Sequence, residues 1–561
     1  MQENKRKQQS FEYGAIILLC STMLVKVIGA CFKIPLAMIL GDLGYGYFSS
    51  AYDLFLPIYA LAMAGLPIAI SRVVAENMAK GRYLDVKKSL KITSRIFIVT
   101  GCTAAIIMLL LIKPFVSMTD ATGKTVYSIY AIVPSLFFCC VMSTYRGYFE
   151  GLRNMYPTAI SDVIEALGKL ILGLGFSYAI LRLTNNVALA AAGAMLGITV
   201  GGAASATFLY LRYKIKGDAI TERELDESPA VESGRKIAKT LIVIAIPIVM
   251  TSLANNISSL VDVTMVKWQL NRLMESSSDI IRNMYSASIF DYNKLAIKEL
   301  TNAELPTFLY GVRSKAYTLY NLVPTITSVL GVSALPVVAT AWTNKDSALL
   351  KRNIESPMKF TALISMPIGM GFIFMGSEVM KLVYSTTASY EIGGAMLRIY
   401  GVTAIFGGLA TSMTSMLQAI GKEKISLRNV AIGAALKVLV NLIFVGIPTI
   451  NIQGAAMGTA VSFIFIFSAN LLSLIKYTGI KPNLWKAVLK PFISALACGL
   501  STMVLDLNFM GKLGAIIEIA IAAVVYLIVL IALNTFEKDD VISLPQGEKL
   551  LNVLTKLKII R

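Results

Sequence analysis

Long apolar runs, separated by short polar segments, follow one another along nearly the whole chain. A helix that crosses a bilayer needs about 20 such residues. Runs of this length fall at 14–40, 46–70, 92–114, 126–148, 158–181, 187–211, 240–266, 308–338, 358–383, 395–419, 429–447, 453–475, 486–506 and 513–534. Repeated ten-residue segments of alternating polarity, which a membrane β-barrel requires, do not compete with this pattern. The sequence therefore predicts an all-α integral membrane protein with about 14 transmembrane helices.

The polar segments between these runs differ sharply in basic content. Lys and Arg gather in the N-terminal tail and at 71–91, 212–239, 341–359, 421–428 and 476–490, whereas the turns at 41–45, 385–391 and 448–451 carry none. Because basic loops stay on the cytoplasmic side, we expect the first group, and both termini, to be cytoplasmic. The first apolar run contains Lys26 and Lys33 and has no convincing cleavage site, so it is expected to remain as a span rather than a signal peptide.

Composition narrows the chemistry further. The 561 residues are 56% hydrophobic and 15% charged, with a formal net charge of +19. Because this charge lies mostly in the loops, it indicates topology and not a nucleic-acid partner. Histidine is absent, so the usual zinc ligand and general base are missing, and proton coupling would need carboxylates. We expect no metal, no cofactor and no catalytic residue, since the six cysteines lie in apolar segments without metal-ligand spacing: Cys20, Cys31, Cys102, Cys139, Cys140 and Cys498.

The first half of the chain repeats in the second. Tyr45-Gly46, Ser49, Ala51 and Tyr52 recur at an offset of 265 (310 − 45) as Tyr310-Gly311, Ser314, Ala316 and Tyr317. Ile164, Ala166 and Lys169 recur at an offset of 268 (437 − 169) as Ile432, Ala434 and Lys437. These matches predict two six-helix lobes of the same topology around a central cavity.

The expected organisation has five parts. They are an N-lobe at 1–215, a cytoplasmic linker at 216–239, a C-lobe at 240–476 with an outward-facing, partly helical insertion at 267–307, a final helix pair at 477–535 and a cytoplasmic tail at 536–561.

Two segments, 34–72 and 148–167, carry a family resemblance: IPLAMILGDLGYGYFSSAYDLFLPIYALAMAGLPIAISR and YFEGLRNMYPTAISDVIEAL. The chain resembles the polysaccharide-transporter side of the multidrug/oligosaccharidyl-lipid/polysaccharide superfamily, in particular the stage V sporulation protein B group, which is related to the MurJ lipid II flippases. The resemblance covers about residues 11–535. It implies a cavity that opens alternately to each side of a bacterial plasma membrane. It also implies a substrate of undecaprenyl pyrophosphate bearing sugars; a monomer is the default for the fold.

Two lysines inside the first span are the leading candidates for binding such a substrate. Lys26 lies near mid-membrane, and Lys33, seven residues on, returns to the same helix face. Cations inside a membrane are costly unless they face water or an anion, so both are expected to line the cavity. The alternative is that they neutralise carboxylates such as Asp53 within a packed lobe.

Span 308–338 offers the matching cation of the second half. Arg313 lies one turn from Tyr317, and a guanidinium can hold a phosphate with two parallel hydrogen bonds. The MurJ resemblance implies basic residues on the helices that match spans one and eight, and these positions correspond to Lys26, Lys33 and Arg313. We expect Lys315, on another face, to reach the outer interface. The candidate substrate-binding set is Lys26, Lys33, Tyr52, Asp53, Arg313 and Tyr317; the tyrosines suit sugars but are also common in interfacial belts.

A second set concerns ion coupling or charge pairing. Asp262 is expected to pair with Lys437 or to bind a coupling cation, with Asn441 one turn beyond Lys437. Some MurJ relatives bind sodium with carboxylates on both matching helices, and Lys437 lies roughly where one of these would fall. This departure argues against a copied sodium site. Lys169 is expected to pair with Glu165 in its own helix.

The hypothesis favoured by these residues is a flippase that moves lipid II or a related lipid-linked oligosaccharide outward. A cation-coupled multidrug exporter of the same superfamily would prefer acidic cavity residues and usually has twelve helices. A membrane glycosyltransferase or polymerase would need carboxylates on sizeable loops. The outward loops are short apart from 267–307, whose acidic residues lack metal-like spacing.

Overall fold

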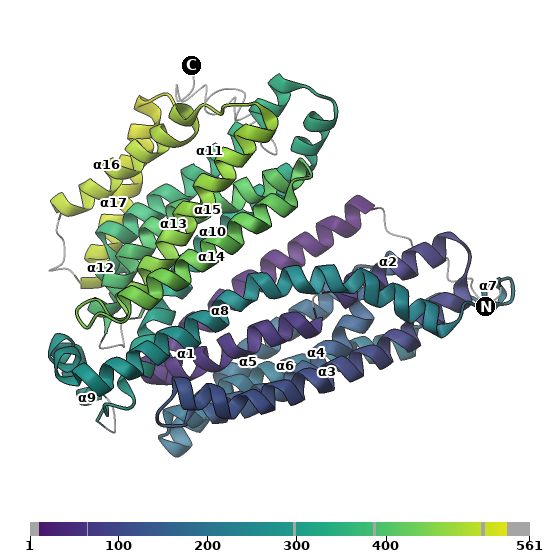
Figure 1. The fold of residues 1–561 in the computed structure, drawn as a ribbon, viewed down its shortest axis with the longest axis horizontal. Coiled ribbons are helices and arrows are strands. Elements are labelled where there is room, and N and C mark those ends of the chain that lie inside the picture. The colour runs from purple at the N-terminus through teal and green to yellow at the C-terminus, as the bar shows by residue number, and fades with distance from the viewer. Residues whose placement is uncertain are drawn as a thin grey trace. The chain divides into compact units, whose positions relative to one another are not determined.

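The computed structural model describes residues 11–63, 65–229, 231–295, 299–384, 389–505 and 511–535, and within these ranges it is helical without β-strands (Figure 1). Two compact units divide the chain: Met1–Met274 with Leu300–Gly311, and Glu275–Glu299 with Val312–Arg561. The all-α membrane fold predicted from the sequence is confirmed.

Within its described residues, the first unit contains seven helices and most of an eighth. They are α1 (Phe11–Met63), α2 (Leu66–Ala79), α3 (Tyr83–Thr119), α4 (Thr125–Gly151), α5 (Tyr156–Thr184), α6 (Val187–Lys216), α7 (Glu222–Asp226) and α8 (Gly234–Met284) up to Met274. The first turns of α10 (Leu305–Thr343) also belong to it.

The second unit contains the end of α8, the rest of α10, α9 between them and the helices after α10. They are α9 (Ser286–Leu295), α11 (Ser347–Phe374), α12 (Gly376–Val383), α13 (Tyr390–Ala419), α14 (Glu423–Phe444), α15 (Gln453–Thr478), a π-helical turn (Trp485–Leu489), α16 (Lys490–Leu505) and α17 (Gly511–Ala532).

Twelve helices in the described residues are long and apolar enough to cross a membrane. One of them, Cys20–Ala79, covers two predicted spans, 14–40 and 46–70. The predicted span 240–266 lies on α8, which is not among the twelve. Each of the fourteen predicted spans therefore lies mostly on helix in the described residues. Some helices begin well before the predicted start, as α3 does, whereas α14 and α17 end a few residues before the predicted end.

Glycine makes the turn that was expected at 41–45. Gly41 has φ 66° and ψ −167°, a backbone conformation that side chains with a Cβ rarely adopt, and it bends α1 without an intervening loop. The two predicted spans are therefore halves of one element, because a single residue is enough to redirect the helix.

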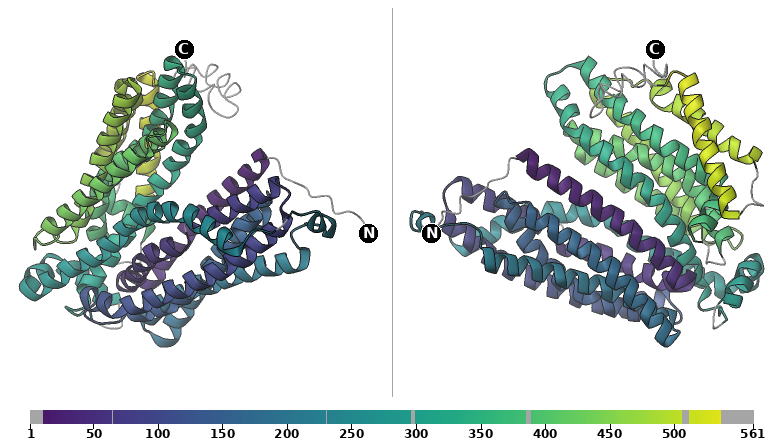
Figure 2. Two further views of the ribbon diagram at one scale, coloured as in Figure 1. Left: turned by 45° about the vertical axis from the view of Figure 1, so that its right-hand side comes forward. Right: turned by 180° about the vertical axis from the view of Figure 1, so that it is seen from behind.

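In the first unit, α5 packs along α6, α4 lies against α3 and α6, and α1 contacts α5 (Figure 2). α5 and α6 approach closely at Gly173 and Gly197, where a Cβ on Gly197 would clash with the Gly173 backbone. Small residues permit this contact between membrane helices, where van der Waals packing drives association.

In the second unit, α13 has a larger buried share than the other candidate membrane spans, and it packs against α11 and α15. The final helices α16 and α17 pack against each other and on α11. Tyr526 of α17 donates a hydrogen bond to the Leu363 carbonyl of α11 at 2.9 Å. The helix pair that was expected after the second lobe is therefore an integral part of this unit.

The insertion predicted at 267–307 is mostly helix. α8 continues through a bend at Ser277 to Met284, α9 follows, and α10 begins at Leu305. The repeat assigned all of 240–266 to the C-lobe, and the structure places α8 up to Met274 in the first compact unit. The tail expected at 536–561 lies outside the described residues.

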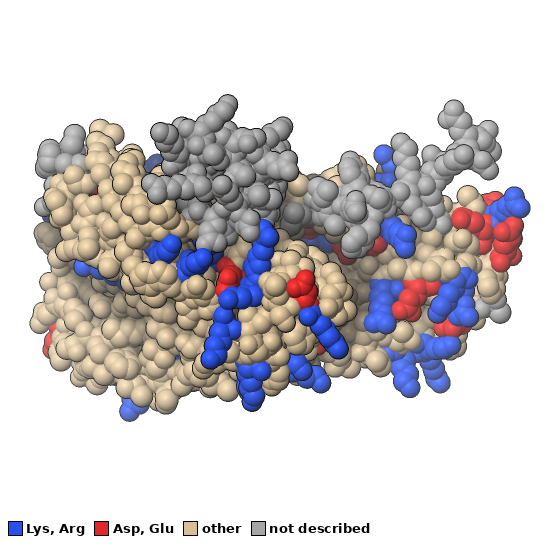
Figure 3. All heavy atoms as spheres, turned by 90° about the horizontal axis from the view of Figure 1, so that it is seen from above, with Lys and Arg blue, Asp and Glu red and all other residues tan. Residues whose placement is uncertain are grey.

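The surface agrees with a lipid environment. Large apolar side chains are widely exposed, among them Leu110 (72%), Leu183 (83%) and Val504 (85%). Figure 3 shows Lys and Arg gathered in groups with broad uncharged areas beside them. Such surface would be unfavourable in water, so these helix faces are suited to contact lipid.

Candidate functional site

The first unit holds a lysine against an aromatic ring. Lys33 of α1 is half-buried, and its Nζ lies 5.4 Å from the centre of the Tyr52 ring on the same helix beyond the Gly41 bend. Lys26, two turns earlier on the same helix, is exposed. Neither lysine forms an ion pair within the described part of this unit. The positive charges are thus available to an anion.

Tyr52 is held in place by a run of aromatic residues along one face of α1. Ring centres are 5.7 Å apart for Tyr45 and Phe48, 5.8 Å for Phe48 and Tyr52, 6.1 Å for Tyr52 and Phe55, and 5.3 Å for Phe55 and Tyr59. Their spacing of three or four residues places them one above the other on the helix. The ring face that meets Lys33 is therefore fixed by its neighbours.

Asp53 is tied to the start of α10. It accepts a hydrogen bond of 2.6 Å from the hydroxyl of Tyr310, a residue of the first unit. Tyr310 is the repeat counterpart of Tyr45 and is completely buried. Asp53 thus has a role in joining helices, in addition to its predicted place near the substrate.

The second unit repeats the pairing of a cation with a tyrosine. Arg313 is 3% exposed, and its Cζ lies 5.6 Å from the centre of the Tyr317 ring. Tyr317 contacts Tyr320 and Tyr400, with ring centres 5.3 and 5.8 Å away. Tyr52 and Tyr317 are related by the repeat offset of 265 (317 − 52). Each unit therefore places one cation over an equivalent tyrosine.

The second predicted set is divided between the units. Asp262 of α8 lies in the first unit and is 5% exposed. Lys437 and Asn441 of α14 lie in the second, at 7% and 0%. A Cβ on Gly458 of α15 would clash with the Asn441 side-chain oxygen, so α14 and α15 meet at this amide. The pairing of Asp262 with Lys437 stays a prediction.

The prediction for Lys315 is wrong. Instead of reaching the interface, its side chain is completely buried, with Nζ 5.7 Å from the centre of the Tyr384 ring. The Tyr384 hydroxyl donates to the Lys315 carbonyl at 3.4 Å. Tyr384, the residue after α12, packs against α10 and encloses the Lys315 amine. The prediction used only the helix face on which Lys315 lies, and this position does not show which distant residue packs against it.

An ion-pair cluster in the first unit was missed. Arg146 of α4 pairs with Asp162 at 2.9 Å and with Glu165 at 3.0 Å, both on α5. Its Nε donates to Ser161 at 2.8 Å. The expected pair of Glu165 with Lys169 is wrong, since no ion pair joins them in the described residues. The only available signal was that Asp162 and Glu165, three apart, share a helix face.

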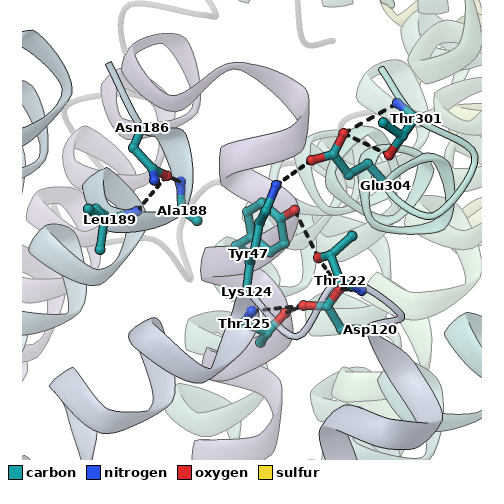
Figure 4. Close-up of polar contacts among 10 residues, drawn as sticks. All are labelled: Tyr47, Asp120, Thr122, Lys124, Thr125, Asn186, Ala188, Leu189, Thr301 and Glu304. Carbon is teal, nitrogen blue, oxygen red and sulfur yellow. Dashed lines mark hydrogen bonds and ion pairs between the residues drawn. The ribbon is translucent and has the colours of Figure 1, made fainter. Parts of the chain in front are cut away.

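A second polar cluster lies where α3, α4 and the start of α10 meet (Figure 4). Lys124 pairs with Glu304 at 2.6 Å, and Tyr47 lies 3.3 Å from the Thr122 hydroxyl. Asp120 accepts hydrogen bonds from the amides and hydroxyls of Thr122 and Thr125.

These contacts change the acidity of both carboxyl groups. Burial by itself would raise the pKa of Asp120, but the Lys267 ammonium and the threonine hydrogen bonds outweigh it and lower the pKa. Burial also opposes ionisation of Glu304, yet the bonds from Lys124 and Thr301 lower its pKa. Both groups are therefore held as carboxylates at neutral pH.

The arrangement defines a multi-pass helical membrane protein whose two units each hold a cation beside a tyrosine. More than half of the chain, residues 13–343, matches the model of the polysaccharide biosynthesis protein family. Residues 316–524 match that of the lipid II flippase MurJ. The chain belongs to the polysaccharide biosynthesis protein family.

Relatives of similar length agree with this assignment. The chain is 24% identical to stage V sporulation protein B of Bacillus subtilis (strain 168) over 547 residues, which are 96% of this chain and 98% of the relative. It is also 24% identical to the lipid II flippase MurJ of the same organism over 532 residues, 91% and 92% of the two chains.

Two solved structures share the fold. A lipid II flippase MurJ in an inward closed conformation superposes with a TM-score of 0.65 at 14% identity and covers 92% of this chain and 98% of its own. An inward-facing multidrug resistance transporter of the MATE family gives 0.62 at 17%, with 83% and 99% covered. At such identities the likeness concerns the fold alone.

Proposed function

We propose that this protein moves an undecaprenyl-pyrophosphate-linked oligosaccharide, lipid II or a related precursor, from the inner to the outer leaflet of a bacterial plasma membrane. The observation that carries the proposal is that Lys33 pairs with Tyr52 and Arg313 with Tyr317, two tyrosines at equivalent positions of the internal repeat. Lipid II flippase MurJ is also a relative along most of the chain.

The chemistry of the substrate explains why such pairs are useful. A diphosphate carries about two negative charges, and its transfer into hydrocarbon without partners costs several kcal/mol. An ammonium and a guanidinium would replace the lost hydration with charged hydrogen bonds. A tyrosine face holds each cation in position beforehand and offers an apolar surface on which a sugar ring can pack.

The proposal assigns different roles within the candidate set. Lys26, Lys33 and Arg313 bind phosphate, and Tyr52 and Tyr317 orient two of these cations. Asp53 keeps α1 and α10 together through Tyr310. Asp262, Lys437 and Asn441 remain candidates for ion coupling. The working protein is a monomer with both termini in the cytoplasm, as the basic segments predict.

The test is complementation of a flippase-depleted bacterial strain, combined with a lipid II accessibility assay. A charged hydrogen bond is worth about 1.5–3 kcal/mol, so each of Lys26→Gln, Lys33→Gln and Arg313→Gln should slow lipid II exposure by about tenfold or more. The matched control is Lys113→Gln, an exposed lysine of α3 outside the candidate set. Full rescue by the triple glutamine variant at normal expression would contradict the proposal.

Two further assays separate the competing functions. A multidrug exporter would lower cellular accumulation of cationic drugs, whereas the flippase leaves it unchanged. A glycosyltransferase or polymerase would convert labelled lipid II to polymer when incubated with purified protein, and the flippase would return it unaltered. The fold similarity to a MATE transporter makes the drug assay a necessary control.

A further inference from the structure

Helix α10 belongs to both compact units. Leu300–Gly311 is part of the first unit, and the chain from Val312 is part of the second. The helix nevertheless runs without interruption from Leu305 to Thr343. Its first two turns are thus held by one unit while the remainder packs in the other.

These turns touch α1 at a pair of glycines related by the internal repeat. A Cβ on Gly46 would clash with the carbonyl oxygen of Thr307, and a Cβ on Gly311 would clash with that of Asp42. Both pairs obey the offset of 265 (311 − 46 and 307 − 42). The two backbones therefore meet at equivalent points of the two halves, in a contact that only glycine permits.

A polar clasp lies beside this glycine crossing. Figure 4 shows two of its contacts: the Lys124–Glu304 pair, and the Thr301 hydroxyl that donates to Glu304 at 2.9 Å. The Tyr310–Asp53 bond is the third, and it joins the start of α10 to α1. Lys124 lies in the turn between α3 and α4. The charge pattern assigns this turn, like Gly41–Tyr45, to the outer side.

We propose that the glycine crossing and the clasp are the closed form of an outer gate, and that the start of α10 leaves the first unit when cargo is released outward. At the two glycines the contact is between backbones, and the clasp consists of polar bonds that water can replace. Arg313 lies two residues beyond Gly311 on the same helix, so opening also moves this cation. This last step rests on the proposed transport of a phosphate-bearing lipid.

The first experiment locks the clasp. Lys124→Cys and Glu304→Cys are combined in a full-length chain whose six native cysteines are replaced by serine, and a short bifunctional methanethiosulfonate joins them. The inference predicts that the linked protein no longer rescues the depleted strain or exposes lipid II, and that a reductant restores both. Unchanged lipid II exposure by the linked protein would overturn the gate.

The second experiment opens the crossing without any substrate. Gly46→Ala and Gly311→Ala should raise labelling of a Thr307→Cys thiol by a membrane-impermeant maleimide at least severalfold. Gly29→Ala is the matched control on α1, because nothing lies within 4 Å of its added Cβ. Equal labelling in Gly46→Ala and Gly29→Ala would refute the inference.

The two experiments distinguish a failed gate from a failed assignment of cargo. If the glycine variants increase labelling but the parent chain does not expose lipid II, the gate stands and the proposed cargo is wrong. If the parent chain exposes lipid II and the linked form does so equally well, the proposed function stands and the gate is wrong.

Discussion

Arg146 is the residue whose removal should most clearly damage the first unit. Its guanidinium joins α4 to Asp162 and Glu165 of α5, and its Nη2 lies 3.3 Å from the Ser205 hydroxyl of α6. Arg146→Met keeps much of the apolar stem but leaves two carboxylates without their cation. We therefore expect the packing of these three helices to lose stability.

The size of the loss follows from burial. Breaking a fully buried ion pair on one side costs about 3–5 kcal/mol, because the remaining charge stays buried and unpaired. The Asp162 and Glu165 side chains retain 24% and 23% exposure, so water compensates part of this cost. An expectation of about 2–3 kcal/mol follows, or roughly a 5 °C lower thermal midpoint at about 2 °C per kcal/mol.

Thermal denaturation of the detergent-purified protein tests this reasoning through the order of three variants. Arg146→Lys should be intermediate, since one ammonium cannot reach both carboxylates with fork geometry. The triple variant Arg146→Met, Asp162→Asn, Glu165→Gln should be more stable than Arg146→Met alone, because no unpaired charge remains. If the triple variant is no more stable than the single one, uncompensated charge is not the cause.

Three smaller predictions concern the first unit. The pKa of Glu304 is lowered from 4.5 by its bond to Lys124, so the clasp is stabilised above the ordinary pKa and weakens as the pH falls through the lower value; thiol labelling at the start of α10, divided by that of an exposed reference cysteine at the same pH because the reactive thiolate is scarce in acid, should rise in acid, and Glu304→Gln should remove this dependence. Lys267→Met should lower the thermal midpoint by several degrees, because it removes the ammonium that acts on the buried Asp120 carboxylate and the bond to Ser50 at 3.1 Å; an unchanged midpoint would contradict this. Asn186→Ala removes the acceptor for two amides at the start of α6 and should cost about 1 kcal/mol, a small fall in the same assay that Asn186→Ser should largely avoid.

Some parts of the candidate site could be predicted from local pattern. Lys33 and Tyr52 were chosen because charge and hydroxyls are unusual inside apolar spans, and this reasoning needs only the sequence. Their direct contact could not be predicted, because it depends on the bend at Gly41, which brings two parts of α1 together. The prediction that Lys315 reaches the outer interface was wrong for a similar reason, because its neighbour Tyr384 lies 69 residues further along the chain.

The sequence by itself determined the membrane class, the positions of the spans and the internal repeat, because each depends on the composition of continuous segments or on the order of residues. The tertiary structure alone decided which charges meet, since Glu165 forms its ion pair with Arg146 of α4 and not with Lys169 of its own helix. It also decided where the compact units divide. It also decided that Gly46 and Gly311 carry the contact between α1 and α10. The partner of a side chain depends on where helices cross, and these crossings are set by packing between segments that are far apart in the sequence. A local sequence pattern therefore cannot predict the partner.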